Sequence, residues 1–348
     1  MDGPSALLLQ APRQLAFEPL PTPGLAPGEV RIRTLFSGIS AGTELSQYRG
    51  SNPFMNRRFD EGARLFLEAE APSWPYPVRN LGYEEVGEIV EVGPDVAGLK
   101  VGDRVFGTWG HRTHHLAAAD YARDRLLPPG ADPRIGVFSH IGAVALNGVH
   151  DAQIRIGDLV VVFGLGVPGQ IACQAARASG ATVVGVDPVA DRRETALKLG
   201  AHRVLDPTAG SVAEAIKGET AGRGADVCIE VTGAAPALGE AIRTAAYSGR
   251  VVAMGFFQGE APLRLGEEFH LNRIQLISSQ ISGVAPEASY RWSKLRLWQT
   301  AVRLQHEGVL SLTPLISHVA PFAEAPSLFA RLDAGEPGLL QAVLEFAG

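Results

Sequence analysis

The stretch that decides the fold is LVVVFGLGVPG, which runs from Leu159 to Gly169. Its first five residues form an apolar run with the length of one buried strand, and residues 164–169 have the spacing G-x-G-x-x-G. In such a turn the first glycine permits a tight bend, the second lets the backbone approach a pyrophosphate, and the third lets the next helix pack against the strand. We therefore predict a dinucleotide diphosphate site made by Gly164, Leu165, Gly166, Val167, Pro168 and Gly169.

The residues around this turn predict a parallel sheet with helices on both faces. Apolar runs alternate with helical stretches, which is the pattern of a doubly wound α/β unit. The expected strands cover residues 159–163, 182–187, 203–205, 226–231, 250–256 and 274–282, and the expected helices cover residues 167–179, 191–199, 211–217 and 236–246. Six strands are enough for a complete Rossmann domain.

An acidic residue, Asp187, ends the second of these strands. A carboxylate there can accept both hydroxyls of the adenosine ribose and would repel a 2′-phosphate, so we expect NAD rather than NADP. Arg192 is interpreted either as part of a solvated helix start or as a group that stacks on adenine or tolerates NADP. The ends of the fourth and fifth strands are interpreted as ordinary turns or as the nicotinamide site, formed by Val231, Thr232, Gly233, Met254, Gly255 and Phe256.

The first third of the chain has a different pattern. Its β-like runs, at residues 29–36, 85–92 and 103–108, are separated by Gly and Pro turns, which predicts an antiparallel, barrel-like domain. A late helix at 290–306 and a last strand at 339–346 do not continue the later alternation, so we assign them to this first domain. The predicted domains are a discontinuous barrel of residues 1–141 and 285–348 and a dinucleotide-binding domain of residues 142–284.

Residues 51–78 interrupt the early β pattern with prolines and with five aromatic side chains, Phe54, Phe59, Phe66, Trp74 and Tyr76. The segment is interpreted either as a surface excursion or as a lid over a substrate pocket, because long ordered loops often carry function.

Composition excludes several classes of protein. With 348 residues, 46% of them hydrophobic, the chain can build two domains with cores of their own. A formal net charge of −6 without a basic run argues against nucleic acid as a partner. The two cysteines, Cys173 and Cys228, allow neither a disulfide framework nor a structural zinc site of four cysteines, and they favour the cytoplasm. We find no secretory leader, and we expect no association with a membrane.

The chain resembles the medium-chain dehydrogenase/reductase superfamily, in the group of zinc-type alcohol, polyol and threonine dehydrogenases, over nearly its full length. The matching stretches are residues 37–44 (SGISAGTE), 82–88 (GYEEVGE), 101–105 (VGDRV), 164–169 and 249–252 (GRVV). The resemblance implies a GroES-like catalytic β-barrel domain beside the Rossmann domain. It also implies a homodimer or homotetramer assembled through residues 274–282.

The chain departs from this family at the positions of the zinc ligands. Ser40 stands in place of a ligand cysteine, Tyr83 in place of the histidine of Gly-His-Glu, and His140 in place of a third ligand. A catalytic zinc needs about three ligands of the imidazole, thiolate or carboxylate kind, and only Glu84 and His140 qualify. Other ligands could come from Glu44, His111, His114 and His115. We expect neither catalytic nor structural zinc, with a weak metal site at Glu84 and His140 as the alternative.

Hydrogen-bond donors can replace a metal in stabilising charge on a substrate oxygen. The catalytic candidates that the resemblance implies are Ser40, Thr43, Tyr83, Glu84 and His140. Ser40 and Tyr83 would contact the substrate oxygen, Thr43 would begin a proton relay, and Glu84 would orient the site. His140 is interpreted either as the general acid and base or as a satisfied core imidazole. The stretch with Trp109, His111, His114 and His115 is interpreted as a solvated loop or as a wall of the cleft.

Together these features predict an NAD(H)-dependent oxidoreductase that interconverts a secondary alcohol and a ketone or aldehyde by hydride transfer, without catalytic zinc. Its partner would be a small-molecule substrate. Two alternatives stay open: a zinc-free quinone or enoyl reductase of the same superfamily, against which Asp187 counts, and a nucleotide-binding sensor without turnover.

Overall fold

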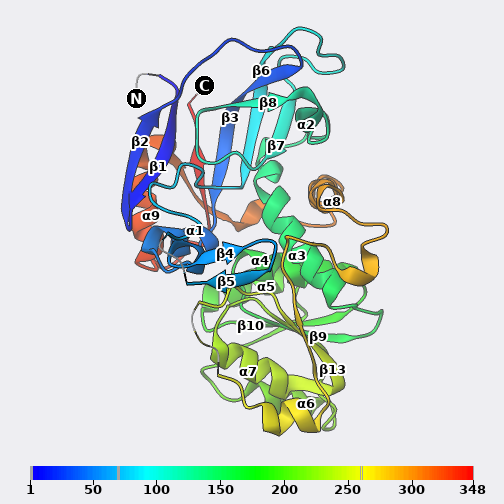
Figure 1. Cartoon of the computed structure of the whole chain (residues 1–348). Coiled ribbons are helices and arrows are strands. Elements are labelled where there is room, and N and C mark those ends of the chain that lie inside the picture. The colour runs from blue at the N-terminus through cyan, green and yellow to red at the C-terminus, as the bar shows by residue number, and fades with distance from the viewer. Residues whose placement is uncertain (1–2, 69–70, 259, 261, 348) are drawn as a thin grey trace. The chain divides into compact units, whose positions relative to one another are not determined.

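The computed structural model describes residues 3–68, 71–258, 260 and 262–347. The terminal residues 1, 2 and 348 of the predicted barrel domain, and residues 69 and 70 of the 51–78 segment, lie outside the described residues. The chain divides into two compact units, which Figure 1 shows in sequence colours. The first unit contains residues 1–140 and 313–348, and the second contains residues 141–312.

The second unit is a six-stranded parallel sheet. Its strands are β9 (Leu159–Phe163), β10 (Thr182–Val186), β11 (Arg203–Leu205), β12 (Ala225–Glu230), β13 (Ala245–Ala253) and β14 (Gln275–Ser278), and their spatial order is β11-β10-β9-β12-β13-β14. The helices between them are α4 (Val167–Ala178), α5 (Ala190–Leu199), α6 (Val212–Glu219) and α7 (Ala235–Thr244); α4 packs with α5 and α6 packs with α7 (Figure 1). This order confirms the predicted doubly wound Rossmann sheet.

Helix α8 (Lys294–His306) lies in the second unit, whereas the sequence predicts it in the barrel domain. Its apolar side buries Leu297 and Ala301, and a Cβ added to Gly142 of α3 (Ser139–Asp151) would meet the Ala301 Cβ at 2.8 Å. After the helix, the backbone N–H of Ser311 donates to Oε1 of Gln174 at 2.7 Å, and Nε2 of Gln174 donates to the Ser311 carbonyl at 3.1 Å. These contacts hold residues 285–312 against the Rossmann elements, so loss of the β-α alternation does not mark the domain boundary.

The first unit is built on a mixed sheet. Its strands are β3 (Glu29–Ile39), β6 (Glu85–Val92), β7 (Arg104–Gly107), β8 (His114–Ala118), β15 (Ile316–Pro321) and β16 (Gln341–Glu345), in the order β15-β16-β3-β6-β7 with β8 also paired to β3. All pairs are antiparallel except β15 with β16. Because β16 pairs with β3, the end of the chain returns to this unit.

Shorter elements complete the first unit. They are the hairpin of β1 (Ser5–Ala11) and β2 (Gln14–Pro19), and the helices α1 (Thr43–Arg49), α2 (Ala119–Arg123) and α9 (Ala325–Asp333). Alternate residues of β3, including Val30 and Ile32, are fully buried, as expected for a strand with one face on a core.

The 51–78 segment contains a small hairpin, β4 (Arg58–Asp60) with β5 (Leu65–Leu67). Phe54 stacks on Trp74 with ring centroids 4.4 Å apart, and Phe59 and Phe66 pack on each other at 5.0 Å. These aromatic side chains give the segment a cluster of its own, and its role as a lid stays a prediction. In the described parts of the chain, no helix combines the length and the apolar character that crossing a membrane requires.

Candidate active site

The glycine turn joins β9 to α4 in the second unit. Gly164 has a φ of +93°, which favours glycine, and a Cβ there would meet Cγ2 of Thr232 at 2.6 Å. A Cβ on Gly169 would collide with the Gly164 carbonyl oxygen, whereas a Cβ on Gly166 would meet nothing within 4 Å. The first and third glycines are therefore needed for packing, while the second leaves the backbone open at the start of α4, where helix amides favour an anion.

Asp187 lies just after β10 with only 3% of its surface exposed. Its Oδ2 accepts the backbone N–H of Leu165 at 2.8 Å, and its Oδ1 accepts that of Val189 at 2.8 Å. Arg192 Nη1 lies 3.7 Å from Asp187 Oδ2. Each carboxylate oxygen can accept a further hydrogen bond, so Asp187 braces the glycine turn and keeps acceptor capacity for a ligand hydroxyl.

The ends of β12 and β13 meet beside the glycine turn. A Cβ on Gly233 would lie 2.5 Å from the Phe256 carbonyl oxygen, and a Cβ on Gly255 would collide with the Gly233 nitrogen. Val231 donates its N–H to the Phe163 carbonyl at 2.9 Å, and Phe256 is 42% exposed. The structure therefore brings the residues predicted for the nicotinamide end together.

Two features of this edge differ from simple strand-end turns. The sulfur of Met254 packs into the space where Gly148 of α3 lacks a side chain. Glu230 was not predicted from the sequence. It is a fully buried acid whose Oε1 accepts the backbone N–H groups of Thr232 at 2.7 Å and Gly233 at 3.1 Å. Burial raises its pKa, against the lowering effect of these hydrogen bonds. An acid ending an apolar strand just before Val-Thr-Gly was the available signal.

The predicted catalytic side chains gather in the first unit. The Tyr83 hydroxyl donates to Oγ of Ser40 at 2.5 Å, and we call these two groups the hydroxyl pair. The ring of His140, in the first turn of α3, lies 4.7 Å from the Tyr83 ring. Thr43 is the first residue of α1. The structure thus brings the Ser40 alcohol and the His140 imidazole to the Tyr83 phenol.

Electrostatics favour the neutral forms of Tyr83 and Glu84. Burial raises the pKa of Tyr83, and the charges of Glu84 and Glu44 raise it further. Burial also raises the pKa of Glu84 well above its ordinary value, with Glu44 and Glu85 adding to the effect. Tyr83 therefore acts as a hydrogen-bond donor and not as a phenolate base.

Glu84 is buried and hydrogen-bonded to Gln341 of β16. Its Oε2 accepts Nε2 of Gln341 at 3.2 Å, and a Cβ on Gly38 would fall onto these two side chains. Its orienting role stays a prediction.

His111 belongs to a buried network that the sequence analysis did not expect. Its Nε2 lies 2.7 Å from Glu44 Oε2, its Nδ1 lies 2.6 Å from Ser37 Oγ, and Ser37 Oγ lies 3.0 Å from Glu85 Oε1. His111 is 1% exposed and Trp109 is 4% exposed, so a solvated loop is wrong for this part of the stretch. His115 stacks on Trp109 at 5.4 Å, and Nδ1 of His114 contacts Thr113 Oγ1 at 3.1 Å.

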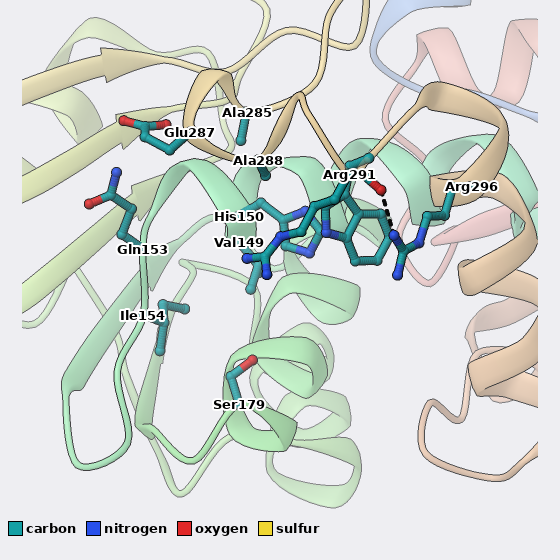
Figure 2. A pocket seen from close by; sticks show the side chains of 11 residues that line it. Val149, His150, Gln153, Ile154, Ser179, Ala285, Glu287, Ala288, Arg291 and Arg296 are labelled. Carbon is teal, nitrogen blue, oxygen red and sulfur yellow. Dashed lines mark hydrogen bonds between the residues drawn. The ribbon is translucent and has the colours of Figure 1, made fainter.

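A separate cavity of about 480 Å³ lies in the second unit (Figure 2). Arg296 Nη1 donates to the Arg291 carbonyl at 2.5 Å, and its guanidinium lies 4.1 Å from the Trp292 ring centroid. Burial, and then the charges of Arg291 and Arg296, lower the pKa of His150. None of the predicted site residues is among those that line this cavity, so it is not part of the candidate active site.

Comparisons with known proteins agree with this architecture. The family model described as zinc-binding dehydrogenase matches residues 168–298, and the one described as alcohol dehydrogenase GroES-like domain matches residues 26–125. D-guloside 3-dehydrogenase of Escherichia coli K12 is 36% identical over 331 residues, which cover 93% of this chain and 94% of that protein. (R,R)-butanediol dehydrogenase of Bacillus subtilis is 27% identical over 88% of this chain and 89% of its own length.

Solved structures show the same fold. That of 2R,3R-butanediol dehydrogenase from B. subtilis has a TM-score of 0.78 at 24% identity and covers 99% of both chains. A Rossmann unit joined to a GroES-like domain is the architecture of an alcohol dehydrogenase-like enzyme. The chain belongs to the medium-chain dehydrogenase/reductase superfamily and is an alcohol dehydrogenase-like oxidoreductase.

The residues present do not fit the zinc ion that the family usually binds. Two of the three matching positions carry the hydroxyls of Ser40 and Tyr83, which are bonded to each other. Of the other candidate ligands, Glu44 and His111 pair with each other, His115 stacks on Trp109, and Nδ1 of His114 contacts Thr113 Oγ1. No group of three or more His, Cys, Asp or Glu side chains within the described ranges could hold a metal ion. A zinc ion at this site would lack the ligands it prefers.

Proposed function

We propose that this oxidoreductase uses NAD(H) and interconverts a secondary alcohol with its ketone or aldehyde, without catalytic zinc. The observation that carries the proposal is the part-buried hydroxyl pair, Tyr83 Oη to Ser40 Oγ at 2.5 Å, at positions that match metal ligands in zinc-type relatives. Because Tyr83 donates its hydrogen to Ser40, the Ser40 hydroxyl keeps its own hydrogen for a substrate oxygen. Such a preorganised donor stabilises negative charge on that oxygen.

The coenzyme would be held by residues of the second unit. The turn of residues 164–169 would bind the diphosphate, Asp187 the adenosine ribose, and Thr232 and Gly233 the nicotinamide end. The Asp187 carboxylate supports NAD, since its charge disfavours a 2′-phosphate. Among structural neighbours of 20% to 23% identity, a Sinorhizobium meliloti protein was solved bound to NADP and an E. coli alcohol dehydrogenase complexed with NADH. The neighbours therefore do not decide between the two coenzymes.

A bound nicotinamide would take up the hydride from the carbinol carbon, which becomes the carbonyl carbon. The substrate hydroxyl must lose its proton at the same time. We assign that proton to His140, whose ring lies 4.7 Å from the Tyr83 ring. Ser40 would donate a hydrogen bond to the substrate oxygen. Glu84, held by Gln341, orients the site without carrying the proton.

A panel of substrates tests the proposal. D-gulosides, 2,3-butanediol and sorbitol, which the names of relatives suggest, would be incubated with NAD and with NADP, beside quinones and enones with the reduced coenzymes. We expect a rise in reduced-nicotinamide absorbance with a secondary alcohol and NAD. Turnover of quinones or enones alone would make the enzyme a double-bond or quinone reductase. No turnover with any of these compounds would favour a nucleotide-binding sensor.

We also propose that the protein is a cytoplasmic homodimer or homotetramer. In the described part of the chain the Rossmann sheet ends at β14, which lies within the predicted interface strand 274–282. Sedimentation velocity of the full chain tests the proposal, and a monomer at all concentrations would refute it.

A further inference from the structure

A buried chain of hydrogen bonds ends at the backbone N–H of Ser40, a member of the hydroxyl pair. We call it the His111 relay, and its members are Glu44, His111, Ser37 and Glu85. All four are at most 1% exposed. At one end Trp109 donates its backbone N–H to Glu85 Oε2 at 2.7 Å, and at the other the backbone N–H of Ser40 donates to Glu44 Oε1 at 3.0 Å. The relay therefore runs from β6 to the residue whose hydroxyl would meet the substrate.

The number of hydrogens restricts its protonation. Its three side-chain links need three hydrogens, and Ser37 supplies one. If Ser37 donates to Glu85, then His111 must carry hydrogens on both ring nitrogens, so that Nδ1 donates to Ser37 Oγ and Nε2 donates to the Glu44 carboxylate. If Glu85 is protonated and donates to Ser37, then Ser37 donates to Nδ1 and His111 is neutral. The two arrangements contain the same number of protons and differ by the shift of one proton through Ser37.

We propose that the His111 relay positions the hydroxyl pair and compensates the negative charge beside it, with His111 as the positioning residue on which it depends. This inference rests on the proposed function of Ser40 and Tyr83. Glu44 holds the Ser40 backbone, and its charge opposes the negative charge that develops on a substrate oxygen. The extra proton, on His111 or on Glu85, keeps the net charge of the relay at that of one carboxylate, so the relay favours the oxidation of an alcohol while it keeps that proton.

Gly82 leaves the space in which the side chains of Glu85 and His111 lie. Gly82 has a φ of +102°, and a Cβ there would lie 2.9 Å from both Glu85 Oε1 and the His111 ring. The groups that face His111 are the carboxylates of Glu44 from α1 and Glu85 from β6, the neighbouring Arg112, and the apolar ring of Phe329 from α9 at 5.8 Å. Two carboxylates and one guanidinium therefore set its charge state.

These groups determine how the protonation of the His111 relay changes with pH. Burial raises the pKa of Glu85 to about 7, although the charge of His111 lowers it. Burial lowers the pKa of His111, but the charge and hydrogen bond of Glu44, with the charge of Glu85, raise it above its ordinary value. The extra proton therefore leaves as the pH rises past neutrality, and one buried link is then left without a hydrogen.

Three substitutions test the relay in the full-length enzyme. His111→Gln cannot carry the charge, and we expect turnover to fall about 10-fold to 100-fold through misplacement of the hydroxyl pair, with NADH affinity kept and the alkaline limb of the kcat profile lost. Glu85→Gln offers Ser37 an N–H donor like the protonated acid, so it should keep most of the turnover. Glu85→Ala removes that donor and should lose turnover. His114→Gln, outside the relay, is the control and should match the wild type.

The outcomes separate the relay from the proposed function. Unchanged turnover and pH profile in His111→Gln and Glu85→Ala would overturn the relay, as would an equal loss in Glu85→Gln and Glu85→Ala. A second readout needs no substrate: the ring-nitrogen chemical shifts of His111, assigned with His111→Gln, should change with pH in the wild type and stay at the neutral value in Glu85→Gln. If both proteins give the same shifts, the relay is wrong. Absence of any nicotinamide-dependent turnover in the wild type would refute only the proposed function.

Discussion

Replacement of Tyr83 by phenylalanine removes one oxygen atom from the centre of the proposed chemistry. That oxygen donates to Ser40 Oγ at 2.5 Å, so its loss leaves Ser40 without the donor that orients and polarises it. Misplacement of the Ser40 donor to a developing oxyanion lowers turnover about 100-fold, or about 2.7 kcal/mol. Loss of the hydrogen bond itself costs only about 1 kcal/mol of folding stability. The catalytic effect therefore exceeds the structural one.

The assay compares kcat, the dissociation constant of NADH and the urea midpoint in wild type, Tyr83→Phe and a matched control. Tyr76→Phe is that control, because its hydroxyl donates to the Gln47 carbonyl at 2.9 Å in the same unit. We expect only Tyr83→Phe to lose turnover, with NADH affinity unchanged in both. If the two variants turn over equally well, Tyr83 has no part in the reaction.

Three further substitutions test other parts of the account. Asp187→Asn keeps an acceptor for Leu165 but removes the charge, so NADPH affinity should rise about 10-fold relative to NADH by titration calorimetry; an unchanged ratio would remove Asp187 from coenzyme selection. Gly82→Ala combines a φ of +102° with contacts of 2.9 Å and should cost about 3 kcal/mol in urea unfolding, whereas Gly130→Ala, at a φ of +76° in open space, should cost only about 1 kcal/mol; equal losses would contradict the crowding. Because the folded pKa of Glu85 is about 7 and its ordinary value is 4.5, its stabilising contribution is complete below pH 4.5 and is lost as the pH rises to 7. Glu85→Gln should flatten the fall of the urea midpoint over that range, and an equally steep fall would contradict the assignment.

Sequence patterns predicted the Rossmann unit well because its information is local. Strand β9 is one apolar run, and the collisions that a Cβ would make at Gly164 and Gly169 explain why glycine stands at those positions. Asp187 was predictable because it follows its strand directly and its carboxylate bonds to Leu165 of the turn. Short-range geometry is enough for each of these features.

Features that depend on distant contacts were not predictable in this way. Helix α8 packs through Ala301 against Gly142, and the residue pattern of the helix does not identify that partner. His111 looked like one of several histidines in a loop, yet it is buried between α1 and β3 by Glu44 and Ser37, which are far from it in the sequence. Tertiary packing decides such cases.

The central claim is that the enzyme oxidises a secondary alcohol without catalytic zinc. Zinc analysis of an enzyme sample that reduces NAD with a secondary alcohol is its most direct test. Turnover and metal content would be measured on the same sample before and after dialysis against a chelator. The account predicts full turnover at far less than one zinc per chain, unchanged by the chelator. Near-stoichiometric zinc, with turnover lost on chelation and restored by zinc alone, would contradict it.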